Sequence, residues 1–302
     1  MGLSTVSTFK TLNNRSSKLK KMTNDQLREL QKTLLGILDD IDNVCKKYNL
    51  NYHLTGGSCL GAVRHNGFIP WDDDIDIDMP RKDYTKFCEV FLKEMGDKYW
   101  LHTPEKTKKL GIAFARVRKK DTIFRSREDL QNEKEAGVYI DIFIIENTFN
   151  FKPMRYIHGF LSLEFGFLLS CRNFYQNRKF YFDIIEDNKK VKRAFRMKTI
   201  IGFLLSFLSV DTMVRAWNNV NKMCKNDNSK YVVVPVGRNH FFGETYERSK
   251  FCVMIPHEFE GSQRQLPICI DYDEYLKHMY GDYMKIPKEE DRETHIFLEL
   301  KL

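Results

Sequence analysis

Residues 56–78 read GGSCLGAVRHNGFIPWDDDIDID and decide the fold of this chain. A glycine-rich turn leads into acidic residues that alternate with isoleucines. Because successive side chains of a strand point to opposite faces, we expect Asp74 and Asp76 on one face and Ile75 and Ile77 in a core. Two carboxylates held side by side repel each other unless a cation lies between them. A hard divalent cation such as Mg²⁺, which prefers carboxylate and phosphate oxygens, fits this arrangement.

The composition describes a folded, basic chain. Of its 302 residues 42% are hydrophobic and the net charge is +8. This is enough apolar material for a core and excludes a disordered chain. The positive charge favours an anionic partner, which is a phosphate-bearing substrate, an anionic lipid surface or nucleic acid. A basic soluble protein without such a partner explains the charge equally well.

Other features exclude several classes of protein. The seven cysteines are scattered without a CxxC pair, so neither a disulfide framework nor a zinc site is indicated. No apolar run follows the basic N-terminal residues, as a secretory signal would require. The most apolar run, residues 199–210, is too short to span a bilayer. We therefore expect a cytoplasmic protein with reduced thiols.

The first half of the chain alternates helices and strands. A capping box at Thr23 and Gln26 starts an amphipathic helix. A short helix after the glycine turn directs its N-terminus at an anion. The pattern predicts helices over 24–47, 58–65 and 84–95, and strands over 52–54, 74–79, 112–117 and 137–145. This is a mixed α and β order.

The second half changes character. Residues 152–226 predict helices rich in Phe and Leu, and residues 188–198 hold six Lys or Arg and no acid. A basic stretch before an apolar run is typical of segments that lie on an anionic membrane surface, although a solvated helix face explains it too. Short strands are predicted over 231–236 and 250–255, and a helix near 271–280. We divide the chain into a basic N-terminal segment, a catalytic core, a helical insertion and a part that completes the core: residues 1–22, 23–150, 151–230 and 231–302.

The acidic stretch has simpler interpretations. Asp72 and Asp73 follow Pro70-Trp71 and fit a solvated turn. Neither an EF-hand loop, nor a P-loop, nor a dinucleotide-binding GxGxxG matches the glycines and acids. Asp141 is harder to explain, because a carboxylate inside the apolar run 138–145 needs a compensating charge. A metal shared with Asp74 and Asp76 supplies that charge, and so does a salt bridge to an arginine.

The stretch from Gly56 to Ile77 closely resembles the signature of the LicD family, which includes bacterial phosphocholine transferases and, more distantly, fukutin and fukutin-related protein. This family belongs to the nucleotidyltransferase-fold superfamily, whose pattern of Gly-Gly/Ser, Asp-x-Asp and a third acid matches Gly57-Ser58, Asp74-Ile75-Asp76 and Asp141. The run Tyr280-Gly281-Asp282-Tyr283, with Pro287, Arg292 and His295, is also similar to LicD.

The resemblance implies an α+β fold, in which helices flank a nucleotidyltransferase-like mixed sheet and a helical segment is added in the second half. It implies transfer of phosphocholine or a polyol phosphate from a CDP-linked donor to a sugar hydroxyl of a surface glycan or glycolipid, such as teichoic acid or lipopolysaccharide, with release of CMP. Asp74 and Asp76 are then ligands of Mg²⁺, with Mn²⁺ as a substitute, and Asp141 is a third ligand or the general base. Gly57 and Ser58 hold the donor phosphates.

Five further residues are candidates for contact with the substrate: Arg64, His65, Arg116, Arg118 and His295. Arg116 and Arg118 share one face of their strand, where solvation explains them as well, and a lone His295 near the terminus also fits a structural role. Two other functions stay open. One is an Asp-x-Asp glycosyltransferase that uses a nucleotide sugar, and the other is a non-catalytic adaptor at a membrane surface. Nucleic acid is not expected as a partner, because the interleaved aromatic and basic motifs of RNA-binding modules are absent.

Overall fold

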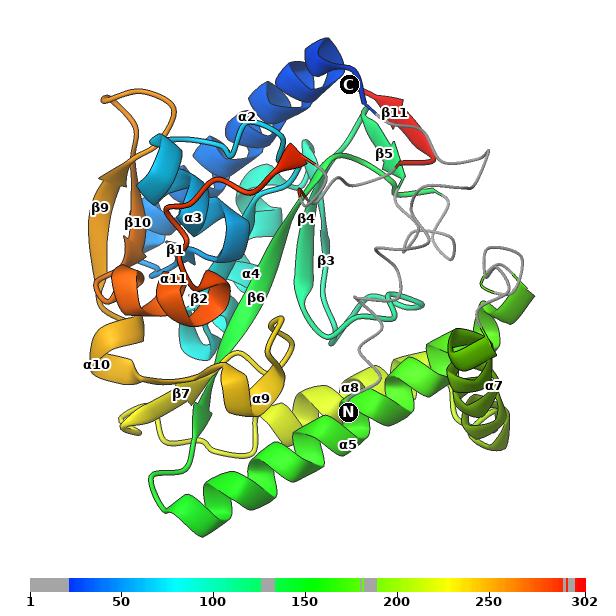
Figure 1. The fold of residues 1–302 in the computed structure, drawn as a ribbon. Coiled ribbons are helices and arrows are strands. Elements are labelled where there is room, and N and C mark those ends of the chain that lie inside the picture. Colours follow the sequence, from blue (N-terminus) through cyan, green and yellow to red (C-terminus); the bar gives the residue numbers. More distant parts are fainter. Residues whose placement is uncertain (1–21, 126–133, 180, 182–188, 290–291, 293–296) are drawn as a thin grey trace.

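A computed structural model of the chain describes residues 22–125, 134–179, 181, 189–289, 292 and 297–302. Its central sheet has the strand order β1 (His53–Leu54), β2 (Asp76–Pro80), β6 (Tyr139–Thr148), β4 (Ala115–Lys119) and β3 (Tyr99–His102). At the far end of β6 this sheet continues into β7 (Tyr231–Val233) and β8 (Thr245–Glu247). β2 runs parallel to β6, and the other neighbours are antiparallel (Figure 1). The predicted mixed sheet flanked by helices is therefore confirmed.

Alternation along the strands gives the sheet one apolar and one polar face. Ile77, Val117 and Ile142 are fully buried in the main core. Helices α2 (Asn24–Tyr48) and α4 (Arg81–Met95) pack on this sheet and contribute to the same core. The predicted capping box is present at the start of α2, where Thr23 and Gln26 bond to each other's backbone N–H. The opposite face of the sheet carries Asp76 and Asp78 of β2, Arg116 and Arg118 of β4 and Asp141 of β6.

The remaining elements of this part of the chain are short helices and one hairpin. They are helices α3 (Gly56–His65), α9 (His240–Gly243), α10 (Arg248–Phe251) and α11 (Tyr272–Tyr280), and the hairpin of β9 (Met254–Glu258) with β10 (Gln265–Cys269). Of these, α11 and β9 contact α3. A second small sheet joins β5 (Ile123–Arg125) to β11 (Glu299–Lys301). The strand predicted over 250–255 is wrong in its first half. Residues 248–251 form the helical turn α10, and a short apolar run does not distinguish a buried turn from a strand.

The added helical segment consists of α5 (Lys152–Gln176), α7 (Lys189–Leu204) and α8 (Val210–Asn221). Figure 1 shows these helices together on one side of the molecule. Leu169, Val210, Met213 and Val214 form a small core of their own, separate from the main one. The segment was predicted to be helical, and that prediction is confirmed. Its boundaries at 150 and 230 stay predictions.

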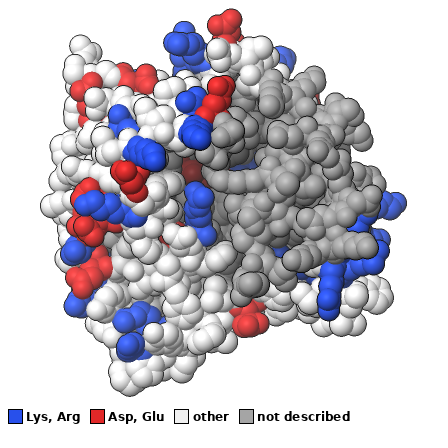
Figure 2. Space-filling model, viewed as in Figure 1, with Lys and Arg blue, Asp and Glu red and all other residues white. Residues whose placement is uncertain are grey.

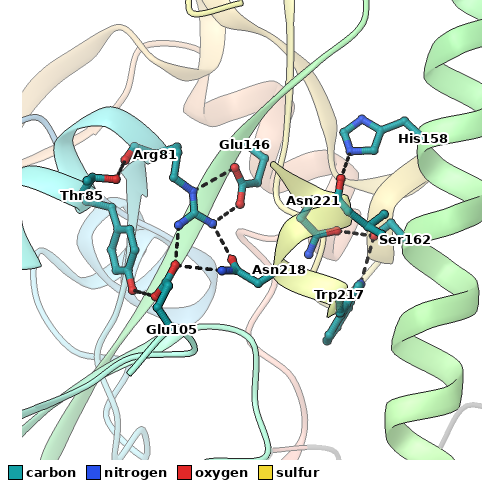
Figure 3. Close-up of polar contacts among 11 residues, drawn as sticks. Arg81, Thr85, Glu105, Glu146, His158, Ser162, Trp217, Asn218 and Asn221 are labelled. Atoms are coloured by element: carbon teal, nitrogen blue, oxygen red, sulfur yellow. Dashed lines mark hydrogen bonds and ion pairs between the residues drawn. The ribbon is translucent and has the colours of Figure 1, made fainter. Parts of the chain in front are cut away.

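A buried polar cluster joins the helical segment to the sheet (Figure 3). The guanidinium of Arg81, at the start of α4, donates to both carboxylate oxygens of Glu146 on β6. It also donates to Glu105 and to Asn218 of α8, at 2.9 and 2.8 Å. A second group links α5 to α8, where Ser162 donates to Asn221 at 2.7 Å. The basic N-terminal segment predicted over 1–22 lies outside the described residues except for Met22.

Candidate active site

The sheet places Asp76 and Asp141 side by side. They are register partners in the parallel pair of β2 and β6, so both side chains stand on the polar face. β2 begins at Asp76, two residues later than predicted, and Asp74 lies in the loop before it. Helix α2 anchors this loop, because the side-chain amide of Gln31 donates a hydrogen bond to the carbonyl oxygen of Asp72 at 2.8 Å.

Helix α3 starts beside these acids. Gly56 has a φ of 52°, which favours glycine, and its N–H donates to the Tyr275 hydroxyl at 2.9 Å. The hydroxyl oxygen of Ser58 accepts a 2.9 Å bond from the Asp76 N–H. Ser58 therefore fixes the start of β2 against the helix. It is buried and is not among the residues that line the cavity described next, whereas Gly57 is.

A cavity of about 460 Å³ opens between this turn and α11. Four aspartates line it at alternate positions of the chain: Asp72, Asp74, Asp76 and Asp78. Basic side chains line it as well: Arg64, Arg238, Lys285 and Arg292. Figure 2 shows acidic and basic side chains next to each other near the middle of this face. A cavity with both charge signs suits a ligand that carries phosphates together with a cation.

The donor set of the acidic loop fits a hard cation. Asp72, Asp73 and Asp74 each offer a carboxylate oxygen, and these oxygens lie within 4.8 Å of one another. Gly57 makes room for this loop, because a Cβ at its position would lie 2.9 Å from an Asp72 oxygen. Carboxylate oxygens are the ligands that Mg²⁺ prefers. The turn predicted at Asp72 and Asp73 is present, with the Asp72 N–H bonded to the Ile69 oxygen at 2.9 Å, but the prediction that it is solvated is wrong, because Asp73 is only 4% exposed.

Asp141 is paired with an arginine. Nε and one terminal nitrogen of Arg116 donate to its two oxygens at 2.5 and 2.9 Å. Arg116 and Arg118 are only 3% and 2% exposed, so the interpretation of these two residues as solvated is wrong. Both guanidinium groups lie over the ring of Tyr139, at 3.9 and 4.6 Å from its centre. The salt bridge that the sequence left open is thus present. A role of Asp141 toward a metal stays a prediction.

The other candidate residues lie at different distances from the cavity. Arg64 lines it, and its guanidinium donates to the Tyr283 carbonyl at 2.7 Å and to His65 at 3.0 Å. Burial lowers the pKa of Arg64 and of His65. His65 packs edge-on against Trp71 and is not among the lining residues. His295 lies outside the described residues.

Two comparisons bear on this site. Residues 49–165 match the family model described as the nucleotidyltransferase domain of LicD, FKTN and FKRP. The chain is 31% identical over 294 residues to the lipopolysaccharide cholinephosphotransferase LicD of Haemophilus influenzae, an alignment that covers 92% of this chain and 97% of that one. This chain belongs to the LicD family. As a LicD-family enzyme it is a phosphotransferase.

Other relatives match a shorter part of this LicD-family chain. Human ribitol 5-phosphate transferase FKRP is 41% identical over 51 residues, which cover 17% of this chain and 9% of that protein. An uncharacterized protein of Rickettsia typhi is 36% identical over 66 residues, which cover 21% of each chain. These short matches support the family and carry no statement about donor or acceptor.

The structure adds two acids to the LicD-family site that the sequence reasoning missed. Asp78, to which the sequence analysis gave no role, is 1% exposed and lines the cavity. Its place two residues after Asp76 was the available signal. Glu244, at the end of α9, is 3% exposed and lines the same cavity. No sequence pattern indicated it. Burial, followed by the charge of Glu244, raises the pKa of Asp78, and a hydrogen bond from Thr55 opposes that rise.

Proposed function

We propose that this protein transfers phosphocholine from CDP-choline to a sugar hydroxyl of a cell-surface glycan or glycolipid and releases CMP. The observation that supports this proposal most is the likeness along almost the whole chain to a lipopolysaccharide cholinephosphotransferase. A cavity that holds four aspartates next to four cationic side chains suits a zwitterionic donor. Transfer of a polyol phosphate from a CDP-linked polyol is the nearest alternative, and the short match to a ribitol 5-phosphate transferase is its support.

Asp74 and Asp76, together with Asp72, would hold Mg²⁺ or Mn²⁺. The bound cation would neutralise charge on the pyrophosphate of the donor. Gly57, at the N-terminus of α3, would hold the donor phosphates, because a helix N-terminus favours anions, and Ser58 behind it would position Asp76 through its 2.9 Å hydrogen bond. Arg64 and Arg292 would hold the cytidine side, where the Arg292 guanidinium lies 4.1 Å from the centre of the Trp71 ring.

In the transfer step, the oxygen of the acceptor hydroxyl attacks the phosphorus that carries choline. The bond between this phosphorus and the bridging oxygen of the pyrophosphate breaks, and its electron pair leaves with CMP. A carboxylate of the site takes the proton of the attacking hydroxyl. Asp141 is our choice for this base or for a further metal ligand, and its bidentate pair with Arg116 would hold its orientation.

Product analysis tests this reaction. The purified protein is incubated with Mg²⁺, a lipopolysaccharide or teichoic acid acceptor and one donor at a time: CDP-choline, CDP-glycerol, CDP-ribitol or a nucleotide sugar. We expect CMP and a phosphodiester product from CDP-choline. Release of a nucleoside diphosphate from the nucleotide sugar, with no CMP from any CDP-alcohol, would favour the glycosyltransferase alternative. A protein inactive on every donor would favour the adaptor.

The helical segment would place the enzyme on the cytoplasmic face of an anionic membrane, where a lipid-linked acceptor is available. Large apolar side chains of α5 and α7 are exposed, among them Phe160 at 60%, Ile200 at 61% and Phe207 at 79% just beyond α7. Arg193 and Arg196 are exposed on the same helix as Ile200, and Figure 2 shows basic side chains where α7 lies in Figure 1. Exposed apolar and cationic side chains together suit an anionic bilayer surface.

Not every residue of the basic stretch belongs to this surface. Lys198 is 6% exposed and donates to Ser170 at 3.0 Å, and burial lowers its pKa. In the described part of the chain no helix is both long and apolar enough to cross a membrane.

Vesicle sedimentation tests the membrane proposal. We expect binding to vesicles with anionic lipid, and a loss of at least about tenfold in affinity for Ile200→Ser/Phe207→Ser, because each side chain buries apolar area in the interface. Arg193→Gln/Arg196→Gln should weaken binding at low salt only. The matched control is Leu92→Ser/Val253→Ser, two exposed apolar residues of the sheet part. Equal binding by all variants would refute the proposal. So would an oligomer that the Ile200 and Phe207 variant converts to a monomer, because the apolar surface would then be covered by a second copy.

A further inference from the structure

Helix α11 is tied to both ends of α3, although the two helices lie far apart in the chain. The Tyr275 hydroxyl accepts a hydrogen bond from the Gly56 N–H at 2.9 Å, and the Tyr283 carbonyl just beyond α11 accepts one from the Arg64 guanidinium at 2.7 Å. In each pair the partners are 219 residues apart. Residues 49–165, which match the family model, contain α3 and do not contain α11. The C-terminal part of the chain therefore completes the glycine turn.

The buried hydrogen bonds around Tyr275 run in one direction. A backbone N–H can only donate, so the Tyr275 oxygen accepts from Gly56. The Thr55 hydroxyl donates to the carboxylate of Asp78. The Thr55 oxygen, 2.8 Å from the Tyr275 oxygen, is then left to accept the tyrosine proton. We call this series from Gly56 through Tyr275 and Thr55 to Asp78 the Tyr275 chain. Its three side-chain members are at most 7% exposed, so water does not readily replace a lost one.

The Tyr275 chain touches residues that the proposed reaction uses. The Thr55 N–H donates to the Asp76 carbonyl oxygen at 3.1 Å. A Cβ at Gly56 would lie 3.9 Å from a carboxylate oxygen of Asp76, so this glycine packs directly beside the proposed metal ligand. The next residue, Gly57, is the proposed contact for the donor phosphates. A shift of Gly56 would therefore move the phosphate-binding turn relative to Asp76.

Tyr275 acts on the site through the backbone of α3. We propose that Tyr275 is a positioning residue, whose hydroxyl fixes the phosphate-binding end of α3 against Asp76. Asp78 anchors the far end of the Tyr275 chain, and this role accounts for a carboxylate that is buried behind the site. The inference rests on the proposed transfer of phosphocholine and adds α11 to the parts of the chain that the transfer requires.

Removal of one hydroxyl tests the position of the turn. Tyr275→Phe keeps the ring and leaves the Gly56 N–H without its acceptor. We expect kcat for CMP release from CDP-choline to fall about 30- to 100-fold with little change in KM, because misplaced reacting groups slow the chemical step. The matched control is Tyr52→Phe. Tyr52 is 3% exposed, donates to Asp42 at 2.8 Å and is not among the residues that line the cavity. Its variant should lose similar stability and keep the wild-type kcat.

Thr55 offers a test with a conservative rescue. It is the N-cap residue of α3, but its side chain makes no capping hydrogen bond, so its replacement removes no cap. Thr55→Val keeps the shape of the side chain and breaks the Tyr275 chain, and it should lower kcat as Tyr275→Phe does. Thr55→Ser keeps a hydroxyl and should recover most of that loss. Because one break is enough, the double variant Thr55→Val/Tyr275→Phe should be as active as either single variant.

Several results would overturn the role of Tyr275. Wild-type kcat in Tyr275→Phe is one, and losses that multiply in the double variant are another. A raised KM with unchanged kcat would mean that Tyr275 binds the substrate directly. An equal loss of kcat in Tyr52→Phe would mean that general destabilisation, and not the position of the turn, lowers activity.

Hydrogen exchange of the Gly56 amide tests the Tyr275 chain without any activity. If wild type releases no CMP from any CDP-alcohol, the proposed function is wrong, and this measurement still decides whether Tyr275 holds the turn. We expect the Gly56 amide to exchange at least about tenfold faster in Tyr275→Phe than in Tyr52→Phe, because its hydrogen bond is lost. Equal exchange in the two variants would overturn the proposal.

Discussion

Charged and apolar side chains are distributed in opposite ways in the sheet and in the helical segment. On the polar face of the sheet, Asp78, Asp141, Arg116 and Arg118 are each at most 9% exposed. On helices α5 and α7, large apolar side chains face outward, and Phe207 just beyond α7 is 79% exposed. The sheet therefore buries what proteins usually expose, and the helical segment exposes what they usually bury.

The difference supports the two kinds of partner proposed above. Buried charges are costly unless they are paired, and Asp141 has its arginine, whereas one oxygen of Asp78 has no hydrogen-bond partner among the described residues. Exposed apolar side chains gain no free energy from burial until another surface covers them. The proposed charged donor would complete the first region, and the proposed bilayer surface would cover the second.

The largest effect is expected at Asp76. Because the polar face of the sheet is proposed to bind the donor, a substitution there should abolish activity and leave the protein folded. Asp76→Asn keeps the shape of the side chain and removes one negative charge at the start of β2, next to the acidic loop. The rate of transfer should fall about 1000-fold, because the substitution removes a carboxylate that would hold the cation at the reacting phosphates. The rate of CMP release, measured at several Mg²⁺ concentrations, checks this.

The matched control for Asp76 is Asp97→Asn, the same substitution at an exposed turn. It should leave both transfer and the unfolding midpoint unchanged. Full activity of Asp76→Asn with Mg²⁺ would contradict the metal assignment. A large drop in the unfolding midpoint would instead mean that Asp76 acts by holding the sheet.

Candidate site residues could be predicted from the sequence where acids alternate with apolar residues or interrupt an apolar run, although β2 begins only at Asp76 and Asp74 lies in the loop before it. Alternation with isoleucines located Asp74 and Asp76, and the lone charge in an apolar run located Asp141. The structure pairs Asp76 with Asp141 across β2 and β6, which no local pattern could show, because register depends on the whole sheet. Glu244 was unpredictable for a related reason: it reaches the cavity only through the long return of the chain after the helical segment.

The elements of the fold, too, could be predicted where their sequence pattern is long. Long periodic elements such as α2 and β6 were predicted within a few residues, since their pattern extends over many turns or alternations. The short turn α10 was mistaken for a strand, because four residues hold too little periodicity to choose between the two. The six basic residues of 188–198 were interpreted together as one exposed basic surface. Tertiary packing instead buries Lys198 against α5.

The next effect concerns the Arg81 cluster, which joins the two regions. Arg81→Leu leaves Glu146, which is 2% exposed, without its charged partner. We expect the free energy of unfolding to fall by about 3–5 kcal/mol, because one member of a buried pair stays charged and uncompensated. Urea denaturation measures this change. The loss should be smaller at low pH, where Glu146, whose pKa is raised by burial, is protonated.

Arg264→Leu is the matched control, because Arg264 forms the same bidentate contact with Asp39 at the surface. It should cost about 1 kcal/mol or less, since solvent screens an exposed pair. Equal costs for Arg81→Leu and Arg264→Leu would mean that burial does not decide the strength of these pairs. The contrast between the two regions would then lose its energetic basis.

The smallest effect is expected at the exposed end of the helical segment. Phe207→Ser should change the free energy of unfolding in solution by no more than about 0.5 kcal/mol, because this side chain has little packing to lose. Phe195→Ser, on the same segment but 3% exposed, should cost about 3 kcal/mol or more, because it leaves a cavity beside Phe174. Urea denaturation of both variants without lipid checks this contrast. If Phe207→Ser destabilises the free protein as much as Phe195→Ser, its ring is part of a core in solution, and the outward-facing apolar side chains would no longer indicate a bilayer.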